Sequence, residues 1–349
     1  MRANHLPFFV LRKEYFGGIL LNMKNYSYTL LTPFEYKLLK ILATEGKIKF
    51  SKMRGLNFSK LKNFLKKMKS LEVLEKDSEQ ITLKEEIRVI KPPLWAFKSK
   101  KLTAPLKVYD TCTRKCNLMC KHCYARSNPY FEEKRRSISQ NIKIIKKFYE
   151  VGILEWNFTG GEPTLLRKSL FPLIKFIKKL NLKVSLNTNG IWDFDPHLLF
   201  STGVDEITIS IDGSKSIHEK RRGKGTFRKV IETLEALYDY NQSSHKPIKT
   251  ILNMCVGKDN VKDIESVVQI GLKYGCDVKF VPIKPVNSLS KKLMLSRNEY
   301  FSFVKNLSNL RKKIELKNPR IDLLLNHKDI FNYSRIGQHT NPYPFDYSQ

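Results

Sequence analysis

Acidic residues, cysteines and long apolar runs are all scarce in this chain of 349 residues. Its 33 aspartates and glutamates face 64 lysines and arginines, which gives a net charge of +31. Such an excess favours acidic partners, for example nucleic acid, an acidic peptide or an anionic surface, without choosing among them. No apolar run reaches the length of about eighteen residues that a membrane-spanning helix needs, so no span is expected.

The opening residues also lack a secretory signal. Residues 1–14 show no basic start followed by a long apolar core and a small-residue cleavage site. The chain has only six cysteines, and disulfides are rare outside oxidising compartments, so a disulfide framework is not expected. These absences favour a cytoplasmic protein.

Four of the six cysteines nevertheless crowd into twelve residues. Cys116, Cys120 and Cys123 are spaced C-x3-C-x2-C, and three thiolates on one short loop can hold three irons of a four-iron cluster. The fourth iron then has no protein ligand and can bind a cofactor or substrate. A zinc site would need a second cysteine pair or a Cys/His set further on, and the remaining cysteines supply neither as a pair. We therefore favour an iron–sulfur cluster over zinc.

The other three cysteines have simpler interpretations. Cys112 allows an alternative C-x3-C-x3-C set, but that set leaves out Cys123. We interpret Cys112 as a packing residue at the end of a strand. Cys255 and Cys276 lie in apolar runs, where a buried free thiol is ordinary.

Four polar motifs follow the cysteine loop in order: NFTGGEPT at 157–164, SLNTNG at 185–190, ISIDG at 209–213 and HEKRRG at 218–223. Taken singly, Gly-Gly and Asn-Gly are turn signals, and paired arginines belong on the surface of so basic a chain. Taken together with CNLMCKHCY, they resemble the radical S-adenosylmethionine superfamily. Within it, they are most similar to the SPASM-type maturase-like subgroup, which modifies peptides and proteins.

This resemblance implies a 4Fe–4S cluster on Cys116, Cys120 and Cys123, with S-adenosyl-L-methionine as the second cofactor. It implies reductive cleavage to methionine and a 5′-deoxyadenosyl radical, which abstracts hydrogen from a peptide or protein. An external donor of the flavodoxin or ferredoxin type would supply the electron. Glu162 and Arg222 are expected at the two ends of the methionine moiety. The residues expected to contact the cofactor are His122, Gly160, Gly161, Glu162, Pro163, Asn187, Thr188, Asn189, Ser210, Asp212 and Arg222.

The region from 106 to 290 alternates strand-like and helix-like patterns, which predicts parallel βα units. The strand-like segments are 106–112, 153–159, 182–188, 206–211, 249–256 and 278–283. Six strands are too few for a closed eight-strand barrel, and the resemblance implies an α/β partial (β/α)6 TIM-like barrel. Each motif falls at the C-terminal end of a strand, where the chemistry of such barrels gathers.

Residues 1–90 predict a small α+β winged-helix domain, and 91–105 predict a linker. Gly17-Gly18 indicates a hairpin, Thr32-Pro33 opens a helix, a second helix begins near Ser59, and 71–83 suggest a wing. This part resembles PqqD-like leader-binding domains, which recognise peptides. Binding of DNA or RNA is the alternative, because nine basic residues and no acid lie between Glu45 and Glu72. The nine are Lys47, Lys49, Lys52, Arg54, Lys60, Lys62, Lys66, Lys67 and Lys69.

Residues 291–349 predict a helical extension. Many relatives carry a cysteine-rich C-terminal domain for auxiliary clusters, whereas no cysteine follows Cys276 here. We therefore expect either an enzyme with one cluster or a shortened chain. Two alternative functions remain open at this point: an RNA-modifying radical enzyme, and a metal-sensing regulator that places its winged helix on DNA.

Overall fold

The computed structural model describes residues 9–23, 27–92, 97, 101–286, 288–315 and 323–325. The chain divides into two compact units. The first comprises Met1–Tyr109, Arg136–Asn157 and Pro172–Val184, and the second comprises Asp110–Arg135, Phe158–Phe171 and Ser185–Gln349. The expected linker and the expected C-terminal extension lie partly outside the described residues. No helix in the described part is long and apolar enough to cross a membrane.

The front of the chain forms a four-stranded sheet in the order β3-β2-β1-β7. β1 (Phe9–Glu14) and β2 (Gly17–Asn22) make the predicted antiparallel hairpin. β3 (Tyr28–Leu31) pairs with β2, and β7 (Ile87–Ile90) runs parallel to β1. Gly17 is required at the hairpin, because its φ is 136° and a Cβ there would lie 2.2 Å from the Leu31 carbonyl oxygen.

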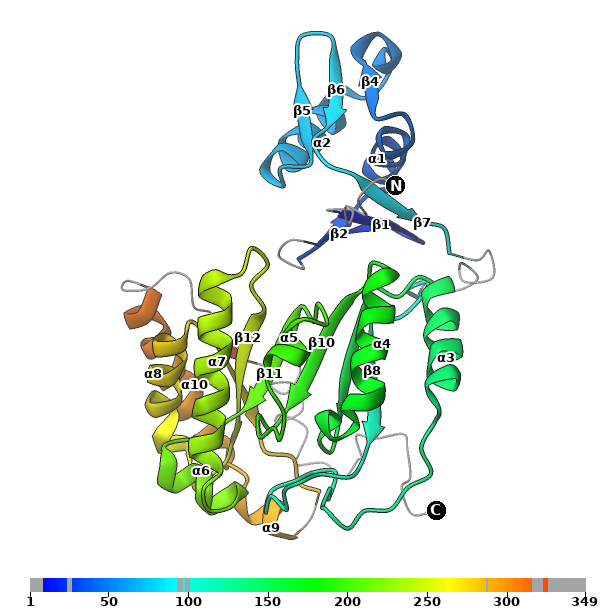
Figure 1. Ribbon diagram of the computed structural model, residues 1–349. Coiled ribbons are helices and arrows are strands. Elements are labelled where there is room, and N and C mark those ends of the chain that lie inside the picture. The colour runs from blue at the N-terminus through cyan, green and yellow to red at the C-terminus, as the bar shows by residue number, and fades with distance from the viewer. Residues whose placement is uncertain are drawn as a thin grey trace. The chain divides into compact units, whose positions relative to one another are not determined.

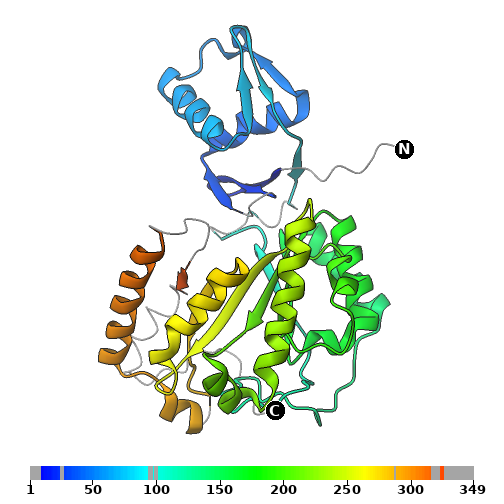
Figure 2. The same cartoon turned by 60° about the vertical axis from the view of Figure 1, so that its left-hand side comes forward.

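Two helices and three short strands follow (Figure 2, blue to cyan). α1 (Pro33–Glu45) begins at the predicted place, with Thr32 and Glu35 forming a capping box. α2 (Phe58–Ser70) fully buries Phe64 and Met68, as its apolar spacing predicts. The remaining elements are β4 (Lys47–Lys49), η1 (Phe50–Met53), β5 (Leu74–Lys76) and β6 (Gln80–Leu83), and the strand order is β4-β6-β5. The winged-helix assignment of this part stays a prediction.

A buried arginine ties the first strand to the rest of the first unit. Arg12 is fully buried and pairs with Glu14 at 2.7 Å. Its guanidinium also donates to the carbonyl oxygens of Gly152 at 2.7 Å and of Ala104 and Pro105, both at 3.1 Å. A truncation that removed this strand would leave those carbonyls without their donor, so single substitutions are the better probe of the front segment.

The predicted strands of the barrel are all present, in chain order across one sheet (Figure 1, cyan to orange). They are β8 (Lys107–Thr113), β9 (Glu155–Gly160), β10 (Lys183–Thr188), β11 (Glu206–Ser210), β12 (Lys249–Val256) and β13 (Asp277–Pro282). The fold-class prediction of a six-strand partial barrel is therefore confirmed. A short seventh strand, β14 (Leu323–Leu325), adds parallel to β13 and was not predicted.

Helices follow the strands, as the alternating pattern predicts. They are α3 (Ile138–Glu150), η3 (Pro163–Leu166), α4 (Arg167–Lys179), α5 (His197–Phe200), α6 (Lys215–Arg222), α7 (Thr226–Ser243), η4 (Val261–Asp263), α8 (Ile264–Tyr274), α9 (Ser288–Leu293) and α10 (Arg297–Glu315). Along β12, Leu252, Met254 and Val256 are fully buried, whereas Asn253 and Cys255 between them are half-buried. Because strand side chains alternate, the C-terminal half of this strand buries apolar side chains on one face and places Asn253 and Cys255 on the other.

Candidate cofactor site

The cysteine loop leaves the C-terminal end of β8 and folds into consecutive turns. Cys116 is buried, and Cys120 and Cys123 are half-buried. The Cys123 amide donates to the Cys120 carbonyl at 3.1 Å, and the Cys116 amide donates to the Asn128 carbonyl at 3.1 Å. Backbone hydrogen bonds therefore hold the three predicted ligands on one compact loop.

The adjacent glycines Gly160 and Gly161 pack against this loop. A Cβ on Gly160 would lie 2.1 Å from the Thr113 carbonyl oxygen, and one on Gly161 would lie 2.1 Å from that of Lys115. The Gly161 amide donates to Thr113 O at 2.7 Å, and the Glu162 amide donates to Lys115 O at 2.9 Å. The absence of a Cβ at both positions therefore lets the end of β9 approach the cysteine loop, and the contact of these glycines with the cofactor stays a prediction.

Glu162 is fully buried, and its carboxylate already has several donors inside the protein. Oε1 accepts from the Thr164 amide (3.1 Å), the Thr164 hydroxyl (2.7 Å) and the Thr188 hydroxyl (2.8 Å). Oε2 accepts from the Asn189 amide at 2.7 Å. Burial raises the pKa of this carboxyl group, although these hydrogen bonds oppose the rise. Glu162 therefore joins the ends of β9 and β10, and its direct contact with a cofactor stays a prediction.

Asn189 connects the end of β10 to the cysteine loop. Its Nδ2 donates to Asn117 Oδ1 at 2.6 Å and lies 3.7 Å from Cys116 Sγ, while its Oδ1 accepts from the Ile191 amide at 2.9 Å. The Leu118 amide is a second donor to the same sulfur, at 3.4 Å. Asn189 therefore helps to position Cys116, and its predicted contact with the cofactor stays a prediction.

Asp212 is the centre of a buried charge network at the C-terminal end of β11. Its Oδ2 accepts from Arg222 Nε at 2.7 Å and lies 3.3 Å from His122 Nε2, and its Oδ1 accepts from the Cys255 amide at 3.2 Å. Arg221 Nη1 lies 3.7 Å from Oδ1. Burial alone would raise the pKa of Asp212, but Arg222, His122 and Arg221 outweigh it and hold that pKa well below its usual range.

Arg222, expected at the methionine carboxylate, is itself buried in this network. Its Nη1 lies 4.0 Å from Cys120 Sγ, so it approaches a predicted cluster ligand directly. Burial lowers its pKa, but the neighbouring Asp212 carboxylate more than offsets this effect, and the net pKa is raised. Arg222 therefore stays charged and links Asp212 to the cysteine loop.

Sequence reasoning missed three members of this network. Arg221 Nε donates to Asp259 Oδ2 at 2.9 Å, and its Nη1 donates to the Cys255 carbonyl. Asn260 Nδ2 donates to the carbonyls of Asp212 at 2.9 Å and Cys255 at 3.0 Å. Asp259 and Asn260 follow the C-terminal end of β12, which is the signal that could have found them.

Two histidines complete the network. His122 is 8% exposed, and its Nδ1 has no hydrogen-bond partner, which makes it a buried polar atom available to a ligand. Burial lowers the pKa of His122 to about 4, so the ring is neutral at pH 7. His218 is fully buried, accepts from the Asp212 amide through Nδ1 at 3.3 Å, and has a pKa that burial likewise lowers to about 4.

The other predicted contact residues fall at the same end of the sheet. Asn187 of β10 and Ser210 of β11 are half-buried. Thr188 is buried, and its hydroxyl accepts from the Gly190 amide and the Trp192 indole, both at 3.1 Å. Pro163 is buried at the start of η3. All eleven predicted cofactor residues therefore lie at the C-terminal ends of β8 to β11 or on the segments that follow these strands.

The donor set fits an iron–sulfur cluster. Nitrogen donors from Leu118 and Asn189 approach Cys116 Sγ, and Arg222 approaches Cys120 Sγ. Hydrogen bonds to ligand sulfurs stabilise the negative charge of a thiolate-bound cluster. Among the described residues, no three His, Cys, Asp or Glu side chains converge on a single ion. A four-iron cluster does not need three side chains that converge on one ion, because each thiolate binds a different iron.

Parts of this chain are similar to several known proteins. Residues 111–270 match the Radical SAM superfamily. The sporulation killing factor maturation protein SkfB of Bacillus subtilis (strain 168) is 30% identical over 227 residues, 60% of this chain and 53% of that protein. The GTP 3′,8-cyclase of Clostridium perfringens (strain SM101 / Type A) is 28% identical over 200 residues, 55% of this chain and 60% of that protein. The chain thus spans little more than half the length of these curated relatives.

A solved structure is similar over nearly the whole chain. SuiB of Streptococcus suis, crystallised with the precursor peptide SuiA, covers 97% of this chain with a TM-score of 0.64. The alignment covers 76% of the SuiB chain at 16% sequence identity. At that identity the likeness concerns the fold alone.

Proposed function

On the premise that residues 111–270 form a Radical SAM domain, we propose that this protein is a radical S-adenosylmethionine enzyme that modifies a peptide or protein. One observation carries the proposal. Three cysteines sit on one loop at the C-terminal end of a barrel strand, and nitrogen donors from two other segments approach two of their sulfurs. That end of the sheet is where barrel enzymes place their chemistry.

In this proposal Cys116, Cys120 and Cys123 hold a 4Fe–4S cluster. When bound, the cluster supplies the electron that splits S-adenosylmethionine into methionine and a 5′-deoxyadenosyl radical, which takes a hydrogen atom from the substrate. The chain's own residues would bind and orient the cofactor: Asn187 and Ser210 are half-buried at the C-terminal ends of β10 and β11, and the buried His122 Nδ1 has no partner within the protein. Reduced thiols of this kind suit a reducing compartment such as the cytoplasm.

The first experiment is anaerobic reconstitution with iron and sulfide, followed by reduction with dithionite. We expect about four irons per chain, as the ligand set predicts. With S-adenosylmethionine present, 5′-deoxyadenosine should form, as measured by liquid chromatography with mass spectrometry. Tightly bound zinc with no iron-dependent colour would contradict the proposal.

A peptide substrate is supported by the relatives and by the front segment. SkfB is named as a maturation protein, and SuiB was crystallised with a precursor peptide. The GTP 3′,8-cyclase is named for a small molecule, so the names of the relatives do not agree on one class of substrate. The element order α1, β4, η1, α2, β5, β6 supports a winged helix in residues 1–90. The basic residues between Glu45 and Glu72 would suit a DNA-binding regulator, whereas the cysteine loop with its nitrogen donors supports an enzyme.

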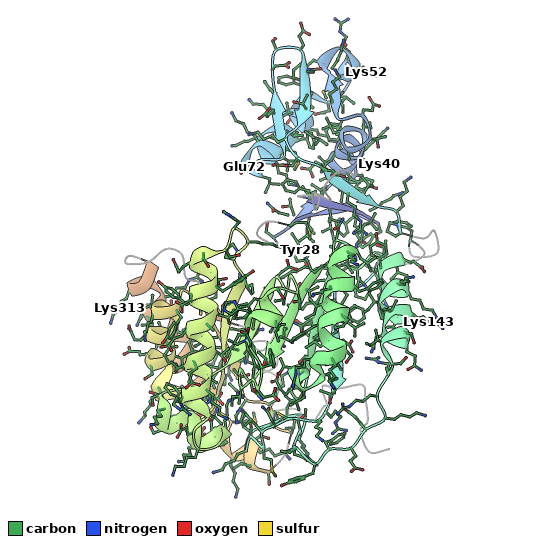
Figure 3. The ribbon with its side chains drawn as sticks, viewed as in Figure 1. Tyr28, Lys40, Lys52, Glu72, Lys143 and Lys313 are labelled. Carbon is green, nitrogen blue, oxygen red and sulfur yellow. The ribbon has the colours of Figure 1, made fainter. Side chains whose placement is uncertain are left out.

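The structure offers a sheet edge beside a basic helix. β3 is the outer strand of its sheet, and Tyr28 and Leu30 on it are 38% and 64% exposed (Tyr28 in Figure 3). Lys67 of α2 donates from Nζ to the Leu30 carbonyl at 2.8 Å, so the C-terminal part of α2 contacts this edge strand. An extended peptide can add a strand to such an edge, and the lysines of α2 favour an acidic one.

We predict that Lys62→Glu with Lys66→Glu on α2 raises the KM for a full-length acidic peptide by about tenfold, because like charges then face each other. Cleavage of S-adenosylmethionine without peptide should not change. Lys37→Glu with Lys40→Glu on α1 is the matched control, since both lysines are exposed (Lys40 in Figure 3).

Mass spectrometry of material that co-purifies from the source cell identifies the peptide to titrate. Recovery of a specific RNA instead would favour the RNA-modifying alternative. An unchanged KM in the α2 variant would contradict the proposal that residues 1–90 bind the substrate through α2.

A further inference from the structure

The segment after β10 meets the cysteine loop through the side chain of Asn189. This residue is 6% exposed, and its Nδ2 lies 2.6 Å from Asn117 Oδ1 and 3.7 Å from Cys116 Sγ. The amide nitrogen of Asn189 is therefore directed at the loop, next to the first of the predicted cluster ligands.

Three hydrogen bonds form a closed cycle around this contact. The Ile191 amide donates to Asn189 Oδ1 at 2.9 Å, and Asn189 Nδ2 donates to Asn117 Oδ1 at 2.6 Å. Asn117 Nδ2 in turn donates to the Ile191 carbonyl at 3.0 Å, which closes the cycle. We call this set of Asn117, Asn189 and Ile191 the asparagine clamp.

The clamp fixes which end of each amide side chain faces which neighbour. The oxygen and nitrogen of an asparagine side chain are told apart by their partners. The backbone N–H of Ile191 only donates, so Asn189 turns its oxygen to Ile191 and its nitrogen to the loop. The carbonyl of Ile191 only accepts, so it holds the nitrogen of Asn117 in the same way. No other orientation of the two amides satisfies all three hydrogen bonds.

The clamp leaves Asn189 with one further hydrogen to donate. An amide nitrogen carries two hydrogens; one is taken by Asn117 Oδ1, and Cys116 Sγ is within reach of the other. Asn117 Oδ1 itself lies 3.8 Å from that sulfur. An oxygen lone pair that faced a thiolate would repel it, so the hydrogen bond from Asn189 also keeps this oxygen occupied.

The backbone beside the clamp is anchored on two sides. The Asn189 amide donates to Glu162 Oε2 at 2.7 Å, and the Thr233 hydroxyl of α7 donates to the Gly190 carbonyl at 2.8 Å. Both hydrogen bonds are buried, and breaking a buried hydrogen bond is costly. Asn189 is therefore a preorganised donor at Cys116.

We propose that Asn117 and Asn189 are positioning residues that raise the reduction potential of the cluster through Cys116. The inference rests on the proposed function, because it needs a cluster bound at Cys116. A reduced cluster carries one more negative charge than an oxidised one, and hydrogen bonds to the ligand sulfurs stabilise that charge. This role is distinct from the contact with S-adenosylmethionine that the resemblance implies for Asn189.

Asn189 is the donor best suited to a test. The Leu118 amide also approaches Cys116 Sγ, at 3.4 Å, but a side-chain substitution leaves a backbone amide in place. Arg222 approaches another ligand sulfur, yet it also pairs with Asp212, so its loss would disturb the buried charge network.

The test is a redox titration of the reconstituted protein without S-adenosylmethionine, followed by the electron paramagnetic resonance signal of the reduced cluster. Asn189→Leu removes the donor and keeps a similar volume. We expect the ratio of reduced to oxidised cluster at a fixed potential to fall about tenfold, a shift of about 59 mV for one electron. Iron content should equal that of the wild type, because the three cysteines remain.

Asn117→Ala opens the clamp from its exposed side. Asn189 then loses the acceptor that holds its nitrogen beside Cys116, and the same ratio should fall about threefold. This variant decides the question if Asn189→Leu does not fold or does not hold iron. Ser210→Ala is the matched control: Ser210 is a predicted cofactor contact on β11, so its loss should weaken S-adenosylmethionine binding and leave the potential of the cofactor-free cluster unchanged.

The possible outcomes separate this inference from the proposed function. Potentials of both asparagine variants equal to that of the wild type would overturn the inference, even if S-adenosylmethionine bound more weakly, because Asn189 would then act at the cofactor alone. A raised potential in either variant would overturn it as well. Cleavage of S-adenosylmethionine by the wild type would leave the proposed function standing in both cases. A wild type that holds no iron–sulfur cluster would overturn both.

Discussion

Replacing Cys116, Cys120 or Cys123 by alanine is expected to abolish the cleavage of S-adenosylmethionine. Each thiolate binds a different iron, so the loss of one leaves the cluster without one of its anchors. Iron content, the iron–sulfur absorption and 5′-deoxyadenosine formation should all collapse, with activity falling by at least about a thousandfold, the order of effect that loss of an essential group has in enzymes.

Cys112→Ala is the matched control, because Cys112 lies on the same segment. Its Sγ donates to the Thr159 carbonyl at 3.3 Å, which is a structural contact. We expect this variant to keep its cluster and most of its activity. The opposite pattern, in which Cys112→Ala loses the cluster and Cys123→Ala retains it, would mean that the alternative C-x3-C-x3-C set holds the metal.

The second large effect is expected from Asp212→Asn. The side chain keeps its shape but loses the charge that faces Arg222, Arg221 and His122 at a fully buried position. Removing one partner of a buried ion pair costs about 3 to 5 kcal/mol, because the remaining charge stays buried without compensation. Chemical denaturation of the cluster-free protein should show a loss of this size in the free energy of unfolding.

Asp259→Asn is the comparison for Asp212→Asn. Asp259 also pairs with Arg221, but its side chain is 23% exposed, so water can compensate for part of the lost charge. We expect a clearly smaller destabilisation from this variant. Equal unfolding midpoints for Asp212→Asn and the wild type would show that the buried network does not stabilise the fold.

Local patterns predicted the elements well. The strand at 249–256 was placed at its observed bounds, and the capping box at Thr32 set the start of α1 correctly. These patterns are apolar runs, helix caps and glycine turns. Each depends on residues that are close in the chain, so it can be recognised without knowledge of the fold. The short strand β14 was missed because three residues carry too little pattern to be recognised.

The contacts that side chains make with other segments of the protein were harder to predict. Gly160 and Gly161 were expected to contact the cofactor, which stays a prediction, and the structure adds that a Cβ on either would strike the backbone of the cysteine loop. Glu162 was expected at one end of the methionine moiety, which stays a prediction, and its carboxylate also accepts from Thr164, Thr188 and Asn189 inside the protein. Thr188 and Asn189 lie on a different segment from Glu162, and the spacing of residues along the chain does not reveal which distant polar groups a side chain will contact.

Covalent order and local apolar periodicity were enough to set the spacing of the three cysteines, the order of the six barrel strands and the end of the sheet at which the motifs gather. The contacts of Asp212 with Arg222, Arg221 and His122, and the approach of Asn189 and Arg222 to the cysteine sulfurs, exist only in the folded chain. Those contacts join residues up to 102 positions apart, and the packing of parallel strands brings them together, because it places the C-terminal ends of distant segments at one edge.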